Sequence, residues 1–213
     1  MKHINPVRKA HWDRIYQTKQ PDKFSWYQEV PETSLSLIKE LNLPKSARIF
    51  DNGGGDSKLV DYLLEQGYHN ITVSDISELA LENVKIRLDK KAELVTWLVA
   101  DEAYCCYSGQ YDLWHDRAAF HFLTDKDEIN NYLNTVRKCV KPNGYIILAT
   151  FSEEGPVNCS GLDVTNYSEG EMTTLFSDGF IKAKCFKKNH ITPFGAKQNF
   201  LFCVFKFVSN QEN

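Results

Sequence analysis

The sequence predicts an α/β domain in which helices cover both faces of a doubly wound, mostly parallel sheet of seven strands. Between residues 47 and 150, short apolar runs alternate with amphipathic helical segments, an order typical of parallel sheets. Three consecutive glycines, Gly53 to Gly55, separate the first apolar run from the helix that follows it. Near the C-terminal end, the runs 180–190 and 198–208 flank the turn "TPFGA" and predict an antiparallel hairpin at one edge.

The first 32 residues are polar but rich in aromatic side chains, namely Trp12, Tyr16, Phe24, Trp26 and Tyr27. This density predicts an arm that docks on the rest of the chain, since disordered tails contain few aromatics. The spacing of Leu35, Ile38 and Leu41 then places their side chains on one face of a predicted helix. We therefore expect an arm at 1–32, a domain at 33–208 and a short tail at 209–213.

The remaining elements follow from periodicity and from capping residues. The expected strands of the parallel part are 47–50, 71–75, 94–101, 111–116 and 145–150. Helices are expected at 57–67, ended by Gly67, and at 77–88, capped by Ser77. Further helices are expected after Thr124 and after the Ser168–Glu171 capping box, and "KPNG" predicts a turn at 141–144.

Composition narrows the class of protein. A chain of 213 residues fits one domain, and 25 basic against 28 acidic residues give a net charge of -3, which does not favour nucleic acid as a partner. No apolar run is long enough for a membrane span, and the first twenty residues lack the apolar segment of a signal peptide. The six cysteines form no C-x-x-C pair, so we expect reduced thiols in a cytoplasmic protein, without a metal site.

The glycine run points to a ligand at the first strand-to-helix turn. Glycine permits positive φ and allows a ligand to lie against the backbone, although a tight turn without a ligand would use the same residues. A dinucleotide fingerprint is not complete, because Lys58 stands where its third glycine belongs and Asp51 would meet the pyrophosphate. A cationic ligand with hydroxyl groups suits this turn better.

Acidic residues end the next two strands. Asp75 follows Gly55 by 20 residues, where an acid accepts hydrogen bonds from ribose hydroxyls, and Asp101 would receive an adenine amine. Taken alone, each carboxylate is more often a helix cap or a solvated loop residue than a ligand contact. Together with the glycines, they predict a nucleoside site.

These motifs carry a family resemblance. "IFDNGGGDS", "VSDIS", "LVADEAYC", "YDLWHDR" and "CVKPNGYIILATF" resemble the successive motifs of class I S-adenosylmethionine-dependent methyltransferases. The "HWDRIY" and "WHDRAAFHFLT" segments resemble small bacterial members, which are distantly similar to lysine methyltransferases that open with W-D-x-x-Y. The resemblance implies a Rossmann-like fold, S-adenosylmethionine as cofactor, and methyl transfer to a small molecule or a protein side chain. Asp56 and Ser57 stand where the family's third glycine usually is.

The resemblance also implies roles for single residues. Gly53, Gly54 and Gly55 would bound the methionine moiety of the cofactor, and Asp51 would face its ammonium group. By the same alignment of motifs, the ribose and adenine would be held by four residues, Asp75, Ile76, Asp101 and Glu102. His115 would line the side of the methyl donor.

The segment "WHDRAAFHFL" supplies the candidates for catalysis. A general base is needed only if the acceptor arrives protonated, and then Asp116 or His115 would serve, with Arg117 as a clamp for an acidic group. The plainer interpretation makes Asp116 and Arg117 a local ion pair and His121 a packed core residue.

The arm and one loop would complete the site. Trp26 and the other arm aromatics would cover the cofactor as a lid, with a cation–π contact to the sulfonium, or would pack against the sheet edge without such a role. The loop 152–162 would shape the acceptor pocket or serve as a surface connection. The alternatives to a methyltransferase are a non-catalytic nucleotide-binding protein and an NAD-type oxidoreductase.

Overall fold

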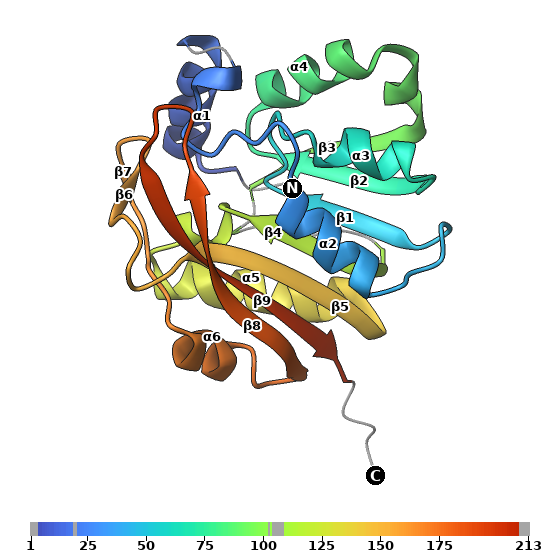
Figure 1. Ribbon diagram of the computed structural model, residues 1–213, viewed down its shortest axis with the longest axis vertical. Coiled ribbons are helices and arrows are strands. Elements are labelled where there is room, and N and C mark those ends of the chain that lie inside the picture. Colours follow the sequence, from blue (N-terminus) through green and yellow to red (C-terminus); the bar gives the residue numbers. More distant parts are fainter. Residues whose placement is uncertain (1–3, 19–20, 102, 104–108, 209–213) are drawn as a thin grey trace.

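The computed structural model describes residues 4–18, 21–101, 103 and 109–208. Its main sheet has the strand order β3-β2-β1-β4-β5-β9-β8 (Figure 1). The order reverses between β1 (Arg48–Asn52) and β4 (Tyr111–Arg117), which are parallel neighbours. Ligands of doubly wound sheets bind beside this reversal, at the carboxyl ends of the strands.

The five parallel strands form the centre and one edge of the sheet. Beyond β1 lie β2 (Asn70–Asp75) and β3 (Val95–Val99), and beyond β4 lies β5 (Val140–Phe151). The pairs Asp51–Val73 and Asp51–His115 fix the register of β1 between its two neighbours. Apart from β3 at the edge, these strands are mostly buried because helices cover both faces. The predicted seven-stranded, doubly wound sheet is confirmed.

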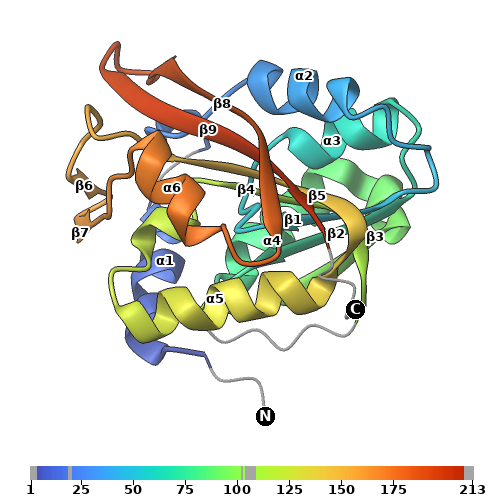
Figure 2. The same ribbon diagram turned by 90° about the horizontal axis from the view of Figure 1, so that it is seen from below.

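Two apolar cores lie on the two faces of the sheet. One contains side chains of α2 (Glu32–Glu40), α3 (Leu59–Glu65) and α4 (Glu78–Leu88). The other contains side chains of α5 (Lys126–Cys139) and α6 (Glu169–Leu175). Figure 2 shows α5 on one side of the sheet and α2 and α3 on the other. Short 3-10 turns at Asp89–Leu94 and Phe120–Phe122 and a two-stranded ribbon of β6 (Asn158–Cys159) and β7 (Leu162–Asp163) complete the domain.

Several local signals are confirmed and two are corrected. The Ser77 hydroxyl caps α4, and Ser168 with Glu171 forms the capping box of α6. Asp125, rather than Thr124, caps α5, because its carboxylate accepts from the backbone N–H groups of Asp127 and Glu128. "KPNG" lies inside the bounds of β5, but the pairing jumps from Tyr111–Val140 to Leu113–Tyr145, so these four residues leave the ladder as a turn would.

The C-terminal hairpin is formed by β8 (Phe180–Ile191) and β9 (Lys197–Phe207), as predicted. Its strands pair Cys185 directly with Cys203, and the two residues form a disulfide with their Cα atoms 4.2 Å apart. The prediction that all six cysteines are reduced thiols was wrong for this pair. The register of two antiparallel strands brings the cysteines together, although 18 positions separate them in the sequence.

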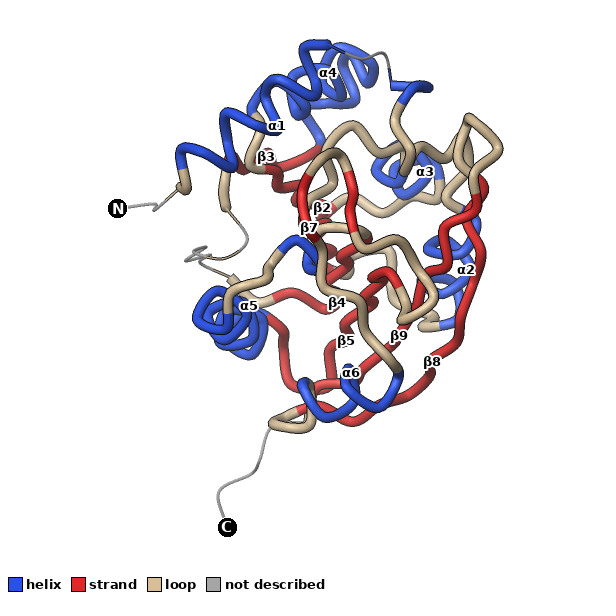
Figure 3. The backbone as a smooth tube through the Cα atoms, turned by 90° about the vertical axis from the view of Figure 1, so that its left-hand side faces the viewer, coloured by secondary structure: helices blue, strands red, loops and turns tan. Residues whose placement is uncertain are grey.

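The N-terminal arm docks on the domain as predicted. It consists of α1 (Pro6–Thr18) and a 3-10 turn at Pro21–Lys23, and α1 packs beside α4 near the carboxyl end of the sheet (Figure 3). Tyr16 and Phe24 are buried in a small apolar cluster with Ala80 of α4. In the part of the chain that the structure describes, no helix has the length and apolar character needed to cross a membrane.

Candidate active site

A cavity with about 880 Å³ of empty space, including the part open to solvent, lies at the carboxyl ends of β1, β2 and β4. Its walls come from these strand ends, from the arm and α2, and from the end of β5, the 152–162 loop and β9. One part is polar and contains the glycine turn and the acids. The other part is aromatic and contains Arg117.

The glycine turn is tightly surrounded. Gly53 and Gly55 have φ values of 62° and 49°, which other residues adopt only with strain. A Cβ on Gly53 would lie 2.4 Å from that of Ala119, and one on Gly55 would lie 2.3 Å from the Tyr16 hydroxyl. Gly53 and Gly54 line the cavity, whereas Gly55 lies behind Tyr16. Tyr16 of the arm therefore contacts the same glycine turn at which the sequence predicts a ligand.

Asp75 lies at the centre of an acidic group. Its Oδ1 accepts from the backbone N–H of Ser77 at 2.8 Å, and Oδ2 faces Gly55. Burial, together with the nearby carboxylates of Asp56 and Asp13, raises the pKa of Asp75 to about 7. Burial also raises the pKa of Asp56 to about 6, and both acids raise the pKa of the Tyr16 phenol, which is already raised by burial. Such acids are suited to accept hydrogen bonds from a ligand with hydroxyl groups.

His115 is held between two polar side chains. Its Nδ1 lies 2.7 Å from Oδ1 of Asp51, and its Nε2 lies 2.8 Å from Oγ of Ser34 on α2. Because the Asp51 carboxylate can only accept, Nδ1 donates, and Nε2 of the neutral ring accepts from the Ser34 hydroxyl. All three side chains are buried and line the cavity. Ser34 was absent from the predicted site, because nothing in its helical stripe distinguishes it from a core position.

Asp116 does not line the cavity. Successive residues of a strand point to opposite faces, and His115 takes the cavity side. The Asp116 carboxylate accepts from Asn52 Nδ2 at 2.9 Å, from the Tyr132 hydroxyl at 2.8 Å and from two backbone N–H groups, those of Ala119 and Phe120. It therefore anchors the turn after β4, and it is poorly placed for the base role that the sequence suggested. The predicted ion pair with Arg117 is also wrong, for the same reason.

Asp101 is held by the arm. Its carboxylate accepts from the guanidinium of Arg8 at 2.7 Å, from the backbone N–H of Asn5 at 3.0 Å and from that of Ala103 at 3.1 Å. It is fully buried and does not line the cavity. Glu102, the other predicted adenine contact, and the Cys105–Cys106 pair lie outside the described residues. Except for Gly55, the remaining predicted cofactor contacts line the cavity, namely Trp26, Asp51, Gly53, Gly54, Asp75, Ile76 and His115.

The aromatic part of the cavity is built from distant segments. Trp12 of the arm packs between Phe122 of the turn after β4 and Trp26, with ring centroids 5.0 Å and 5.8 Å away respectively. Phe151 and Phe200 close the other side, together with Cys159 and Gln198. Sequence reasoning missed most of this wall, although it expected the loop 152–162 to contribute, as Cys159 does. His121 is a packed core residue whose Nδ1 accepts from the Phe151 backbone.

Residues 49–144, from β1 to the "KPNG" turn, match a family model described as a methyltransferase domain. This segment therefore resembles a methyltransferase domain in sequence. The match covers β1 to β4 with the helices between them, and therefore includes Asp51, the glycine turn, Asp75 and His115. Trp26, Ser34 and the aromatic wall from β9 lie outside the matched residues.

Solved structures show that the whole chain has a known fold. A protein studied for the conversion of a disulfide bond into a thioacetal group during echinomycin biosynthesis is 16% identical, with a TM-score of 0.77 over 95% of this chain and 94% of that one. The 1,6-didemethyltoxoflavin-N1-methyltransferase of Burkholderia thailandensis, solved with its substrate and S-adenosylhomocysteine, is 19% identical, with a TM-score of 0.70 over 95% and 85%.

A third similar structure is an S-adenosylmethionine-dependent methyltransferase of Anabaena variabilis, 13% identical, with a TM-score of 0.72 over 97% of this chain and 96% of that one. At these identities the likeness concerns the fold. A search of curated proteins found no significant match. Within the described ranges, no cluster of three or more His, Cys, Asp or Glu side chains is arranged to hold a metal ion.

Proposed function

We propose that this protein is an S-adenosylmethionine-dependent methyltransferase that acts on a small-molecule acceptor. One observation carries the proposal: a single cavity joins a glycine-and-acid region, inside the methyltransferase domain, to an aromatic region built by the arm and the C-terminal strands. The first region suits a nucleoside with hydroxyl groups, and the second suits an organic acceptor. Because the arm narrows the entrance, a small molecule fits this cavity better than the side chain of a folded protein.

The residues present fit the proposed cofactor. The Asp75 carboxylate would accept hydrogen bonds from two ribose hydroxyls, and Gly53 and Gly54 leave room beside the backbone for the methionine moiety. Asp51 would meet the ammonium group while it also orients His115. The cofactor supplies a methyl group on a sulfonium, which is a good leaving group, so positioning and exclusion of water account for most of the catalysis asked of the protein.

His115 is the proposed proton acceptor for an acceptor group that arrives protonated. Asp51 holds its Nδ1 hydrogen and stabilises a positive charge on the ring, as the acid of a catalytic triad does. The Ser34 hydroxyl is hydrogen-bonded to Nε2 and also lines the cavity, so it can pass a proton to the ring and take another from the acceptor. Asp116 instead has a positioning role, through the turn that carries Ala119 against Gly53.

The arm, residues 1–32, is the proposed lid. Trp12, Tyr16 and Trp26 line the cavity from above the strand ends, while Arg8 and Asp13 fasten α1 to the domain. The Arg8 guanidinium lies 2.7 Å from Asp101, and the Ser77 hydroxyl donates to Asp13 at 2.7 Å. These contacts would exclude water from the methyl donor. The aromatic rings would also favour the sulfonium by cation–π attraction.

Calorimetric titration with S-adenosylhomocysteine tests the proposal, with NAD as the comparison ligand. We expect micromolar binding of the first and none of the second. The Asp75→Ala variant should lose tenfold or more in affinity, because a charged hydrogen-bond acceptor is removed. The Asp61→Ala variant, which alters a surface acid paired with Arg87, should not. Binding of NAD alone, or of neither ligand, would refute the assignment of the cavity.

A further inference from the structure

Arg117 has no counter-charge in the aromatic part of the cavity. Its Nη1 donates to the backbone carbonyl of Trp26 at 3.1 Å, and its Cζ lies 5.0 Å from the centre of the Phe200 ring. Its Nε and Nη2 are buried, and no described residue accepts a hydrogen bond from either. No described carboxylate forms a salt bridge with it, since Asp116 points to the opposite face of β4.

The residues around Arg117 show that its charged form is destabilised by loss of solvent. Burial lowers the pKa of Arg117 to about 10, and the guanidinium in turn lowers the pKa values of the neighbouring His121 and His190, both already lowered by burial. Arg117 also forms part of the wall of a second hollow, where Lys188 and His190 outnumber the single acid Glu32. A cation with buried N–H groups that lack an acceptor, and with no carboxylate beside it, destabilises a fold, so its position calls for a ligand that neutralises it.

The walls around the guanidinium restrict the shape of that ligand. Trp12, Trp26, Phe122, Phe151 and Phe200 line the same cavity and offer aromatic faces and edges. Aromatic rings pack well against planar apolar groups. The two free N–H groups of an arginine fork match the two oxygens of a carboxylate.

We infer that the methyl acceptor is a small planar aromatic acid whose carboxylate is bound by Arg117. The inference rests on the proposed function, because it assigns the acceptor half of that same cavity. His115 and Arg117 lie on the same side of β4, two positions apart, a rise of roughly 6.6 Å. A molecule of one or two fused rings spans this interval, and its nucleophilic atom then lies near His115 while its carboxylate lies at Arg117.

The reaction balances for such an acceptor. A lone pair on a nitrogen or oxygen of the acceptor, or a π-electron pair at a ring carbon, forms a bond to the methyl carbon, and the carbon–sulfur bond breaks with its electron pair left on sulfur. The products are the methylated acid and S-adenosylhomocysteine. A proton carried by the attacking atom passes to the Ser34–His115 pair. The carboxylate does not react and serves only to hold the molecule.

A rival assignment places the carboxylate of the cofactor itself at Arg117. The two assignments differ in a measurable way, because 5′-methylthioadenosine lacks the amino acid part of S-adenosylhomocysteine. If Arg117 bound the cofactor carboxylate, Arg117→Gln would weaken S-adenosylhomocysteine binding and leave methylthioadenosine binding unchanged. Under our inference, neither affinity changes by more than about twofold.

The test uses the full chain saturated with S-adenosylhomocysteine and a panel of aromatic acids, among them 2-naphthoate, quinoline-2-carboxylate and indole-2-carboxylate. Each acid is paired with its neutral carboxamide, and binding is followed by calorimetry. We expect at least one acid to bind tenfold or more tightly than its amide, consistent with charged hydrogen bonds. Arg117→Gln should abolish the preference, and Arg117→Lys should restore only part of it, because lysine keeps the charge without the fork.

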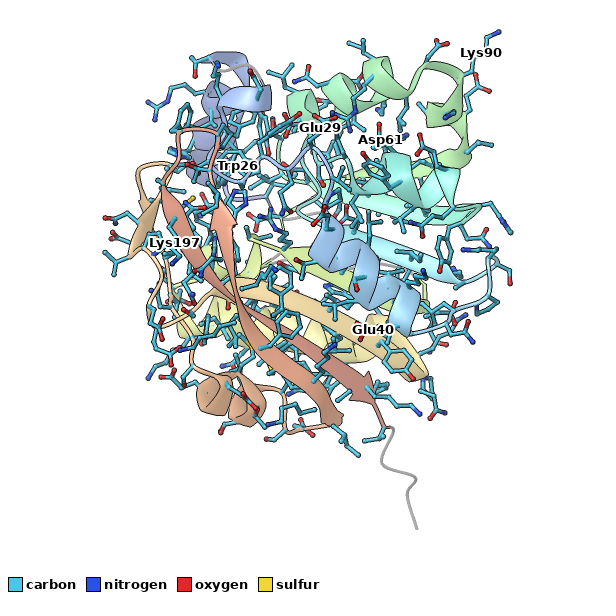
Figure 4. The ribbon with its side chains drawn as sticks, in the orientation of Figure 1. Trp26, Glu29, Glu40, Asp61, Lys90 and Lys197 are labelled. Atoms are coloured by element: carbon cyan, nitrogen blue, oxygen red, sulfur yellow. A yellow bond between two sulfur atoms is a disulfide. The ribbon has the colours of Figure 1, made fainter. Side chains whose placement is uncertain are left out.

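Lys90→Gln is the matched control, since it removes one positive charge from an exposed residue far from Trp26 (Figure 4). It should retain the wild-type preference. Equal binding of every acid and its amide to the wild-type protein, or a preference that survives in Arg117→Gln, would overturn the inference. Loss of S-adenosylhomocysteine binding in Arg117→Gln alone would support the rival assignment. Failure of the wild-type protein to bind S-adenosylhomocysteine would instead refute the proposed function.

Discussion

The affinity for S-adenosylhomocysteine should depend on pH through Asp75. The carboxylate has a pKa raised to about 7 by burial and by the acids around it. Two ribose hydroxyls can donate together only to the ionised form, so binding draws Asp75 into that form. A proton must leave before the ligand binds at low pH. Affinity therefore rises with pH and levels off above the pKa.

The size of the effect follows from the pKa. About one tenth of Asp75 is ionised at pH 6 and about nine tenths at pH 8, so affinity should change by about tenfold, or about 1.4 kcal/mol. The same raised pKa makes the apoprotein less stable as pH rises from about 4 to about 7, because the unfolded chain gives up this proton first. The ligand should thus stabilise the protein most above pH 7.

Calorimetry of wild-type and variant proteins between pH 6 and pH 8 tests this prediction. Asp75→Asn should bind tenfold to a hundredfold more weakly at pH 8, with a flat pH profile. Asp56→Asn removes a like charge that raises the pKa of Asp75, so its profile should move to lower pH. The other groups facing Asp75 are Asp13 and Tyr16, and neither is changed in these variants. A tenfold rise in affinity between pH 6 and pH 8 that persists in Asp75→Asn would refute this role of Asp75.

Four further predictions concern single residues. Arg117→Gln should raise the thermal midpoint of the apoprotein by about 2–4 °C, because it removes a buried charge without a partner, and a lower midpoint would contradict that description. Ser34→Ala should slow turnover by tenfold or more with cofactor affinity unchanged, whereas a loss of affinity would make its role structural. Gly53→Ala should cost about 2 kcal/mol or more in denaturant unfolding, since its φ is 62° and its Cβ would meet that of Ala119, and an unchanged midpoint would count against this packing. Replacing Cys185 and Cys203 by serine should cost about 3 kcal/mol and make stability insensitive to reductant, and a wild-type protein already insensitive would argue against the disulfide.

The polar half of the site could be predicted because its signals are local. A glycine turn directly after a buried strand and an acid at the end of the next strand lie at the same edge of a parallel sheet by topology alone. Asp51, Gly53 and Asp75 therefore came together as expected. Their positions do not depend on how distant segments of the chain pack together.

The choice between His115 and Asp116 shows what local signals leave open. Both residues end β4, and the pleat sends one to the cavity and the other to the opposite core. In a strand buried on both faces, the sequence shows no polar–apolar alternation that would tell the faces apart. Hydrogen bonds from Asn52 and Tyr132, residues on two other elements, reveal where Asp116 points.

The aromatic half was less predictable because its residues come from segments far apart in the chain. Trp26 precedes the domain, Cys159 follows β5, and Phe200 lies on β9. Their meeting depends on how the arm and the hairpin dock, and on the pairing that also joins Cys185 to Cys203. Residue type identified the arm as a docking segment, but it gave no information about its partners.

Three acids lie at the ends of β1 and β2 and in the segment after β3, and each makes different contacts. Asp51 orients His115, Asp75 faces the cavity, and Asp101 fastens Arg8 of the arm. The arm reaches the second of these acids as well, because the Tyr16 hydroxyl lies against Gly55, and its pKa is raised by burial and then by the charge of Asp75. Docking of the arm and ionisation of Asp75 therefore influence each other.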